Sequence, residues 1–227
     1  MSNLSKFVVL GLVAIFLPRF ALAGEAIIFN EPSLIGFRDG EVISGVYDSR
    51  NEKFSCSFLF AEDTGEKKTA NVDGYTETPI LTFVIGEKSP EFSDRDKVFD
   101  IKADLYRRDN EWVIQTRSAQ AGCENATGTF VFDLKDFRAV TYYVTKEVPA
   151  IGIRIVKGKA VFFDNHNGNF LAKKSYLVDR DAVVVLKAQG EYSYIRYVGT
   201  GPKFEGRVTF GWLRSKDLVD PFPHGTK

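Results

Sequence analysis

Short apolar runs with a period of two are the feature that most restricts the fold of this sequence. The run Lys53–Glu62, KFSCSFLFAE, repeats apolar side chains at Phe54, Cys56, Phe58 and Phe60, which predicts a strand with one core-facing side. Similar runs rich in β-branched and aromatic residues occur at Val42–Ser49 and Ile80–Gly86, and a hairpin is predicted around Asp109. Because long helical patterns are missing, we expect an all-β protein with an antiparallel N-terminal unit.

The first 23 residues have the pattern of a secretory signal peptide. Lys6 precedes an apolar run of eleven residues, Phe7–Leu17, and Ala21-Leu-Ala23 fits the small-x-small cleavage pattern. Cleavage is therefore expected after Ala23. The apolar run is shorter than the about 20 residues that a membrane span needs. We expect an exported protein, periplasmic or secreted, with no transmembrane segment in the mature chain.

Two cysteines, Cys56 and Cys123, are the only ones in the chain. In an exported protein an isolated pair predicts a disulfide, and the alternative is two buried free thiols. The two histidines, His166 and His224, are both distant from the cysteines in sequence. We therefore expect no metal site and no cofactor.

Charge divides the chain into two parts. From Ala150 onward there are 13 basic and seven acidic residues, a net of +6, whereas residues 24–149 have 15 basic and 23 acidic residues, a net of −8. This asymmetry favours an acidic β-rich domain at 24–149 and a second domain at 150–227 with a short C-terminal tail. Pro149 and Gly152 mark the boundary; chance scatter over solvated faces is the alternative. Neither part is basic enough to indicate nucleic acid as a partner.

The C-terminal third contains four short motifs in succession: a valine-rich strand at Asp181–Leu186, the segment Gly190–Tyr197, the Gly-Trp-Leu run at Gly211–Leu213, and a terminal Asp-Leu at Asp217. In this order they resemble the bacterial SH3-like domain family. Tyr192 stands at the usual aromatic position, three residues before an aliphatic one. There are two departures from the pattern, a longer loop at 199–206 and tyrosine at position 192 in place of the commoner tryptophan. The resemblance implies a small SH3-like barrel.

The resemblance also suggests a role for the Gly-Trp pair. Gly211 would let two strands approach closely, and Trp212 and Leu213 would point to opposite faces, one buried and one outward. In one interpretation Trp212 fills the core or its rim. In the other, Trp212 lines a groove with Tyr194 and Arg196, and aromatic rings beside a cation suit a peptide or a sugar ring.

The sequence contains no convincing catalytic constellation. The Gly-x-Ser-x-Gly and His-Glu-x-x-His motifs, phosphate loops and dinucleotide fingerprints are all missing. We therefore expect no enzyme but a binding protein of the bacterial envelope that recognises cell-wall (peptidoglycan) peptide or a protein partner through the SH3-like domain. A periplasmic inhibitor or immunity protein, whose acidic half blocks a basic wall-degrading enzyme, is the alternative. A wall hydrolase is a second alternative.

Overall fold

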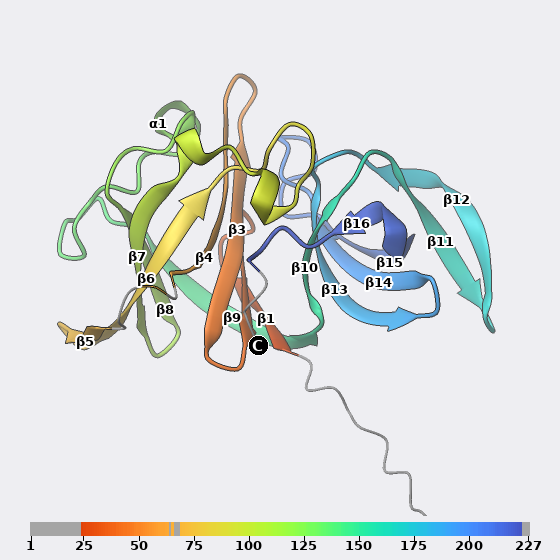
Figure 1. Cartoon of the computed structure of the whole chain (residues 1–227), viewed down its shortest axis with the longest axis horizontal. Helices are drawn as coiled ribbons and strands as arrows, with labels where there is room; N and C mark the ends of the chain where they lie inside the picture. Colours follow the sequence, from red (N-terminus) through yellow and green to blue (C-terminus); the bar gives the residue numbers. More distant parts are fainter. Residues whose placement is uncertain (1–23, 64, 66–68, 224–227) are drawn as a thin grey trace, which may run out of the picture.

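The computed structural model describes residues 24–63, 65 and 69–223, so the predicted signal peptide and His224 lie outside the described residues. Strands make up 56% of the described residues and helix 7%, which confirms the all-β prediction. Figure 1 shows the strands in two groups, side by side. No helix in the described part of the chain is long and apolar enough to cross a membrane.

The first group is a closed barrel of eight antiparallel strands. Each strand pairs with the next along the chain, and the ring closes through β4–β6 and β1–β9. A further strand, β5 (Thr69–Val72), pairs with β6 alone. The barrel strands are β1 (Gly24–Phe29), β2 (Leu34–Asp39), β3 (Val42–Arg50), β4 (Ser55–Glu62), β6 (Tyr75–Phe83), β7 (Ile101–Arg108), β8 (Glu111–Thr116) and β9 (Thr141–Ala150).

Side chains fill the interior of the barrel. An eight-stranded barrel is just wide enough to be filled by its own side chains or to hold one small ligand. On β4 the predicted alternation places Cys56, Phe58 and Phe60 inside, but Phe54 precedes the strand and is 46% exposed. Large apolar side chains from the other strands meet them, including Ile27, Phe29, Leu34, Ile43, Ile80, Leu105, Trp112 and Tyr142.

The segment that carries the short helix α1 (Cys123–Ala126) covers one end of the barrel. The predicted disulfide between Cys56 and Cys123 is present and links α1 to β4 across 67 residues of chain. Phe130 packs against Tyr47 and Phe58, with ring centroids 5.0 and 5.1 Å away. By the loop-entropy model, a bridge of this span stabilises the fold by up to ~4 kcal/mol.

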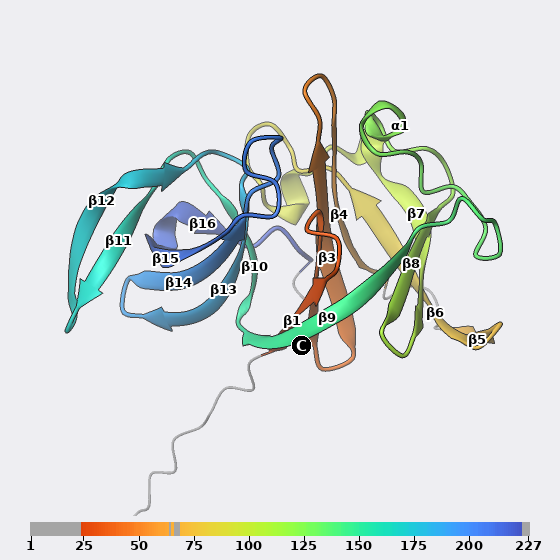
Figure 2. The same ribbon diagram turned by 180° about the vertical axis from the view of Figure 1, so that it is seen from behind.

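The second group is an open, curved sheet of seven strands in the order β12-β11-β15-β14-β13-β10-β16. The chain enters it directly after β9, whose long ribbon runs from the barrel to β10 (Figure 2). The strands are β10 (Gly152–Val156), β11 (Ala160–His166), β12 (Asn169–Leu177), β13 (Ala182–Gln189), β14 (Tyr192–Val198), β15 (Val208–Arg214) and β16 (Leu218–Val219), with a 3-10 turn η3 (Ser215–Asp217) before β16.

An apolar contact joins the barrel to the second sheet, and we call its residues the seam cluster. Val183 and Val185 face the second sheet's own core, whereas Val184 faces the barrel, which explains three consecutive valines on one strand. The seam cluster consists of Ala26, Ile35, Val46, Leu59, Ala61, Phe83, Ile85 and Ala150 from the barrel and the segments next to its strands, and Ile153, Ile155, Val184, Val198 and Phe222 from the second sheet and the segment after it. Complete burial of such side chains contributes about 1.5–3 kcal/mol each.

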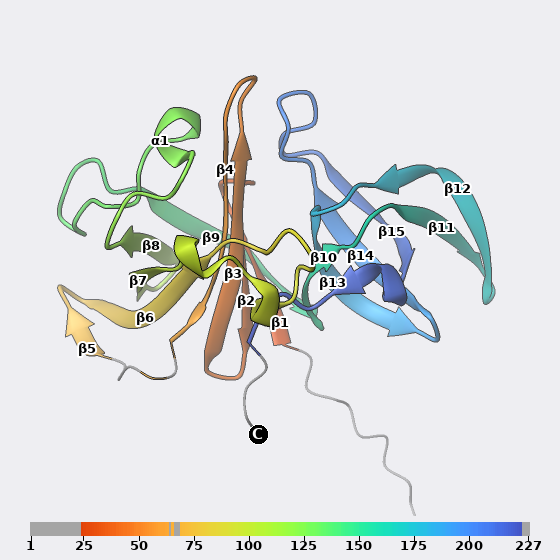
Figure 3. The same ribbon diagram turned by 45° about the horizontal axis from the view of Figure 1, so that its top comes forward.

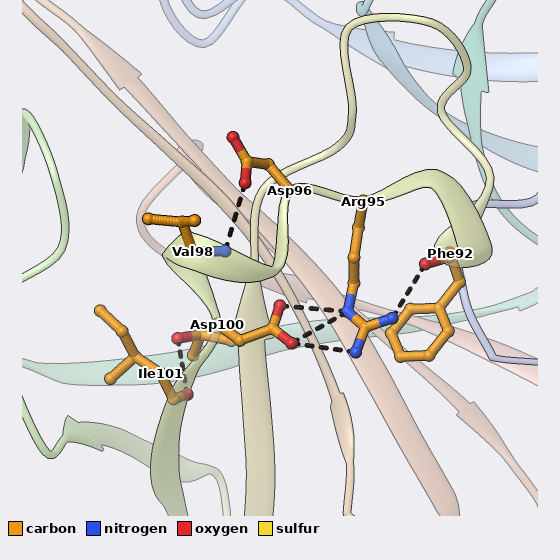
Figure 4. A network of polar contacts seen from close by, with 7 residues as sticks. Phe92, Arg95, Asp96, Val98, Asp100 and Ile101 are labelled. Atoms are coloured by element: carbon orange, nitrogen blue, oxygen red, sulfur yellow. Dashed lines mark hydrogen bonds and ion pairs between the residues drawn. The ribbon is translucent and has the colours of Figure 1, made fainter.

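A loop with two 3-10 turns, η1 (Phe92–Asp94) and η2 (Lys97–Phe99), packs beside this contact. Arg95 lies over the ring of Phe92, 3.9 Å from its centroid, and pairs with Asp100 at 2.9 Å (Figure 4). From the second sheet side, Arg180 Nη2 donates to the Gly86 carbonyl oxygen of this loop at 3.0 Å. Polar contacts thus join the same two units.

Two carboxylates, Asp48 and Asp181, are buried where the barrel meets the second sheet. Asp48 pairs with Arg50 at 2.9 Å and accepts a hydrogen bond of 2.9 Å from the Thr200 hydroxyl. Asp181 accepts hydrogen bonds from the Val178 backbone N–H at 2.9 Å and from the Tyr197 hydroxyl at 3.3 Å. Burial raises the pKa of Asp181, and the hydrogen bond from the Val178 N–H together with the nearby Arg50 offsets only part of this effect.

The raised pKa of Asp181 makes a testable contribution to stability. Because the folded state binds this proton more tightly than the unfolded state, the contribution increases as pH falls from neutral toward about 4 and is lost as pH rises through the folded-state pKa. The substitution Asp181→Asn removes it. Urea unfolding of parent and variant should show the parent gaining stability relative to Asp181→Asn on acidification.

The control is Asp109→Asn, which removes the same charge from an exposed turn whose positive φ suits asparagine. Because this variant keeps Asp181, it should gain stability relative to Asp181→Asn on acidification as the parent does. A difference between the parent and Asp181→Asn that stays constant over the whole range would contradict the assignment.

Candidate functional site

The second sheet exposes aromatic side chains on the face opposite its core. Alternation along β14 places Tyr192, Tyr194 and Arg196 on this face, while Ile195 is buried in the core. The neighbouring strand β15 continues the surface, because Trp212 lies directly across from Tyr194 and Phe210 directly across from Arg196. Tyr194 and Arg196 thus share the face of β14 opposite Ile195, as the alternation in the sequence indicated.

The hairpin of β11 and β12 contributes two more rings to this surface. Asn167 and Gly168 form its turn with φ values of 53° and 93°, a conformation that Asn-Gly adopts readily. Figure 3 shows β11 and β12 curving beyond β15, at the end of the sheet far from the barrel. Phe170 stacks on Tyr192 with ring centroids 3.8 Å apart and contacts Trp212 at 5.3 Å. We call this surface the aromatic face: Phe163, Phe170, Tyr192, Tyr194, Phe210 and Trp212.

Trp212 forms the floor of the aromatic face. It is 8% exposed, and Leu213 on the opposite face is fully buried, so the expectation that one of the two looks outward is wrong. The ring is covered because the β11–β12 hairpin brings Phe170 against it. Gly211 makes room on the core side, since a Cβ there would lie 2.5 Å from the Phe162 ring. Phe210, which is 53% exposed, presents its ring to solvent instead.

Two cations lie over the rings. The Lys187 ammonium is 5.0 Å from the centroid of Tyr194 and 5.4 Å from that of Trp212, and the Arg214 guanidinium is 5.4 Å from that of Phe163. Lys187 reaches this face because a bulge shifts the β13–β14 register between Val185 and Lys187. Contacts of this geometry contribute about 0.5–1 kcal/mol at exposed sites. Sequence alternation alone places Lys187 on the wrong face, which is why this residue was missed.

Arg196 does not supply the cation that lies over these rings. It is half-buried and lines a cavity between the second sheet and the β1–β2 turn of the barrel. Burial lowers the pKa of its guanidinium. Of the three residues expected to form one groove, the structure thus brings Tyr194 and Trp212 into contact, with centroids 5.2 Å apart, and places Arg196 at this cavity.

The remaining chemistry-bearing residues are scattered. His166 is exposed at the end of β11, and both cysteines are in the disulfide. Within the residues that the structure describes, no three His, Cys, Asp or Glu side chains gather in a way that could hold a metal ion. The aromatic face is therefore the surface on which we base the functional argument.

No protein-family model, no curated protein and no solved structure matches this chain. Its function is therefore inferred from the geometry of the site.

The burial of Trp212 predicts a mainly structural role for its ring. Substitution Trp212→Ala should lower the free energy of unfolding by ~3–5 kcal/mol, the usual cost of emptying an aromatic site in a packed region. Phe210→Ala, on the same strand but exposed, should change stability by only about 0.5 kcal/mol. Urea unfolding of the two variants checks this. Equal, small losses for both would mean that Trp212 is not the floor of a packed cluster.

Proposed function

We propose that this protein is an exported, non-catalytic binding protein of the bacterial envelope, and that its aromatic face binds an extended peptide of the cell wall. The observation that carries the proposal is the cluster of six rings on one open sheet face with Lys187 and Arg214 over it. Rings supply large contact area at low entropic cost, and the cations attract carboxylates of a ligand.

The order of elements in the second sheet supports the SH3-like interpretation. After β10 come the β11–β12 hairpin, the three strands β13, β14 and β15, the turn η3, and β16, which pairs back onto β10. The turn η3 ends at Asp217 and is followed by Leu218, the Asp-Leu pair on which the resemblance partly rests. Members of that family bind wall peptides in many cases, which is the reason for choosing this ligand class.

The barrel gives less support to the alternative of an inhibitor with an acidic docking face. Many of its acids are held by arginines of the same unit, so their charge is partly neutralised. The pairs include Glu25 and Glu147 with Arg38, Asp100 with Arg95, Asp104 with Arg117, Glu111 with Arg108, and Asp136 with Arg138. A basic enzyme as ligand remains one outcome of the test.

The test is binding of soluble wall peptide fragments to the purified protein, measured by titration calorimetry. Tyr194→Ala and Phe210→Ala remove two neighbouring rings, whose centroids are 6.3 Å apart. If these rings contact the ligand, each variant should weaken binding by ~2 kcal/mol, about 30-fold, as for a hot-spot aromatic. Circular dichroism establishes that both variants keep their fold.

The matched control is Phe137→Ala. This ring is 94% exposed on the barrel unit, so its loss removes the same kind of side chain without touching the aromatic face. Binding of wall fragments that is equal in all four proteins, or absent in the parent, would overturn the proposal. Capture of a single basic protein from an envelope extract would then favour the inhibitor alternative.

A further inference from the structure

A cavity of about 270 Å³ lies between the β1–β2 turn of the barrel and strand β14. It is larger than the ~150 Å³ cavity that holds a benzene ring in an engineered protein. Its wall combines apolar side chains with a few polar ones. Lining residues on which the argument depends are Ile28, Asn30, Pro32, Ile35, Arg196 and Val198.

Arg196 is the cation of this cavity. Its Nη1 atom is buried, and no atom of the described residues accepts a hydrogen bond from it. Burial lowers the pKa of the guanidinium, and no carboxylate in the part of the chain that the structure describes acts to restore it. A charge taken out of water without a partner is costly, so such groups are normally paired or hydrogen-bonded.

Other arginines in the same protein show the usual arrangement. Arg95 is mostly buried and holds Asp100 at 2.9 Å, and Arg50 holds Asp48 at 2.9 Å. The acid that lines the cavity together with Arg196, Glu31, instead accepts a hydrogen bond from the Ser33 hydroxyl at 3.2 Å. Arg196 is thus a half-buried cation beside an open volume, and among the described residues it has no carboxylate partner such as Arg95 and Arg50 have.

We propose that this cavity binds a carboxylate carried on a small aliphatic group, with the Arg196 guanidinium pairing with the carboxylate. Arg196 can give the carboxylate two parallel N–H donors. Ile28, Ile35 and Val198 supply the apolar wall for the aliphatic part. A free small acid and the C-terminal residue of a peptide can both present such a carboxylate on an aliphatic group.

The position of the cavity favours the C-terminus of a peptide over a free small acid as the carrier of the carboxylate. Tyr194 and Arg196 lie on the same face of β14, two residues apart, which corresponds to roughly 7 Å along a strand. A peptide on the aromatic face whose last residue lies beside Tyr194 would therefore bring its C-terminal carboxylate within reach of Arg196. This extension rests on the proposed function, whereas the acid site itself does not.

The experiment is a titration of the full protein followed by two-dimensional NMR, with 3-methylbutanoate as the probe and its neutral amide as the matched compound. We expect saturable shifts of amide signals around the cavity, such as Ile35 and Gly206, with the acid in the millimolar range and none with the amide. Arg196→Met should weaken binding at least about 10-fold, and Arg196→Lys should retain part of it. Arg207→Met, an exposed neighbour, should bind as the parent does.

A second readout separates binding from folding. Removing an unpaired, half-buried cation should leave the melting temperature of Arg196→Met unchanged or higher, whereas removing a structural arginine would lower it. Equal shifts with acid and amide, unchanged binding by Arg196→Met, or no saturation with the acid would each overturn the acid site.

A further titration tests whether the carboxylate belongs to the C-terminus of a peptide. The tripeptide glycyl-glycyl-valine should perturb the same signals with a free carboxyl terminus and lose this effect when it is amidated. If the free acid binds and the tripeptide does not, the site takes small acids only and its link to the aromatic face is wrong. If the acid binds and the wall fragments do not, the acid site is retained and the proposed function is wrong.

Discussion

The apolar contact between the outside of the barrel and the second sheet is the interaction on which the rest of the structure depends. Val184 and Ile153 on one side and Val46 and Leu59 on the other are almost completely buried there. Neither sheet can leave this surface in water without exposing a large apolar patch. The contact fixes which face of the second sheet is covered and leaves the part bearing the aromatic face open.

The same contact creates the polar features along its border. Asp48 and Asp181 are buried because the two units close over them, and Arg180 reaches carbonyl oxygens of the η1–η2 loop. The cavity beside Arg196 is left where the β1–β2 turn does not fully meet β14. The proposed binding surface and the acid site are thus consequences of how two sheets pack, and neither lies within the barrel, whose interior is filled by side chains.

Local pattern was enough to predict several of the strands, the disulfide and the face of β14 that Tyr194 and Arg196 share. Period-two alternation placed Cys56 in a core, and the only two cysteines of the chain are bonded. Other features depend on contacts between distant residues. Barrel closure requires β1 to pair with β9 and β4 with β6, which no local run specifies, and β1 and β2 were not recognised as strands.

In the candidate site too, some features follow from local pattern and others depend on contacts between distant residues. Tyr194 and Trp212 are brought together by a cross-strand register that their sequence order suggests. Lys187 reaches them only through a bulge, and the position of Arg196 depends on a barrel turn more than 160 residues earlier in the chain. Sequence reasoning placed Tyr194, Arg196 and Trp212 in one groove, whereas in the structure Lys187 lies over the rings and Arg196 lines the cavity.

The central claim, that the seam cluster makes the barrel and the second sheet one cooperative unit, is tested most directly with the chain's two tryptophans. Trp112 lies in the barrel core and Trp212 in the second sheet. In Trp112→Phe, urea unfolding is followed by the fluorescence of Trp212 and by circular dichroism of all strands. We predict coincident midpoints, as for a two-state transition. A fluorescence transition well below the dichroism transition would show that the second sheet unfolds by itself and would contradict the account.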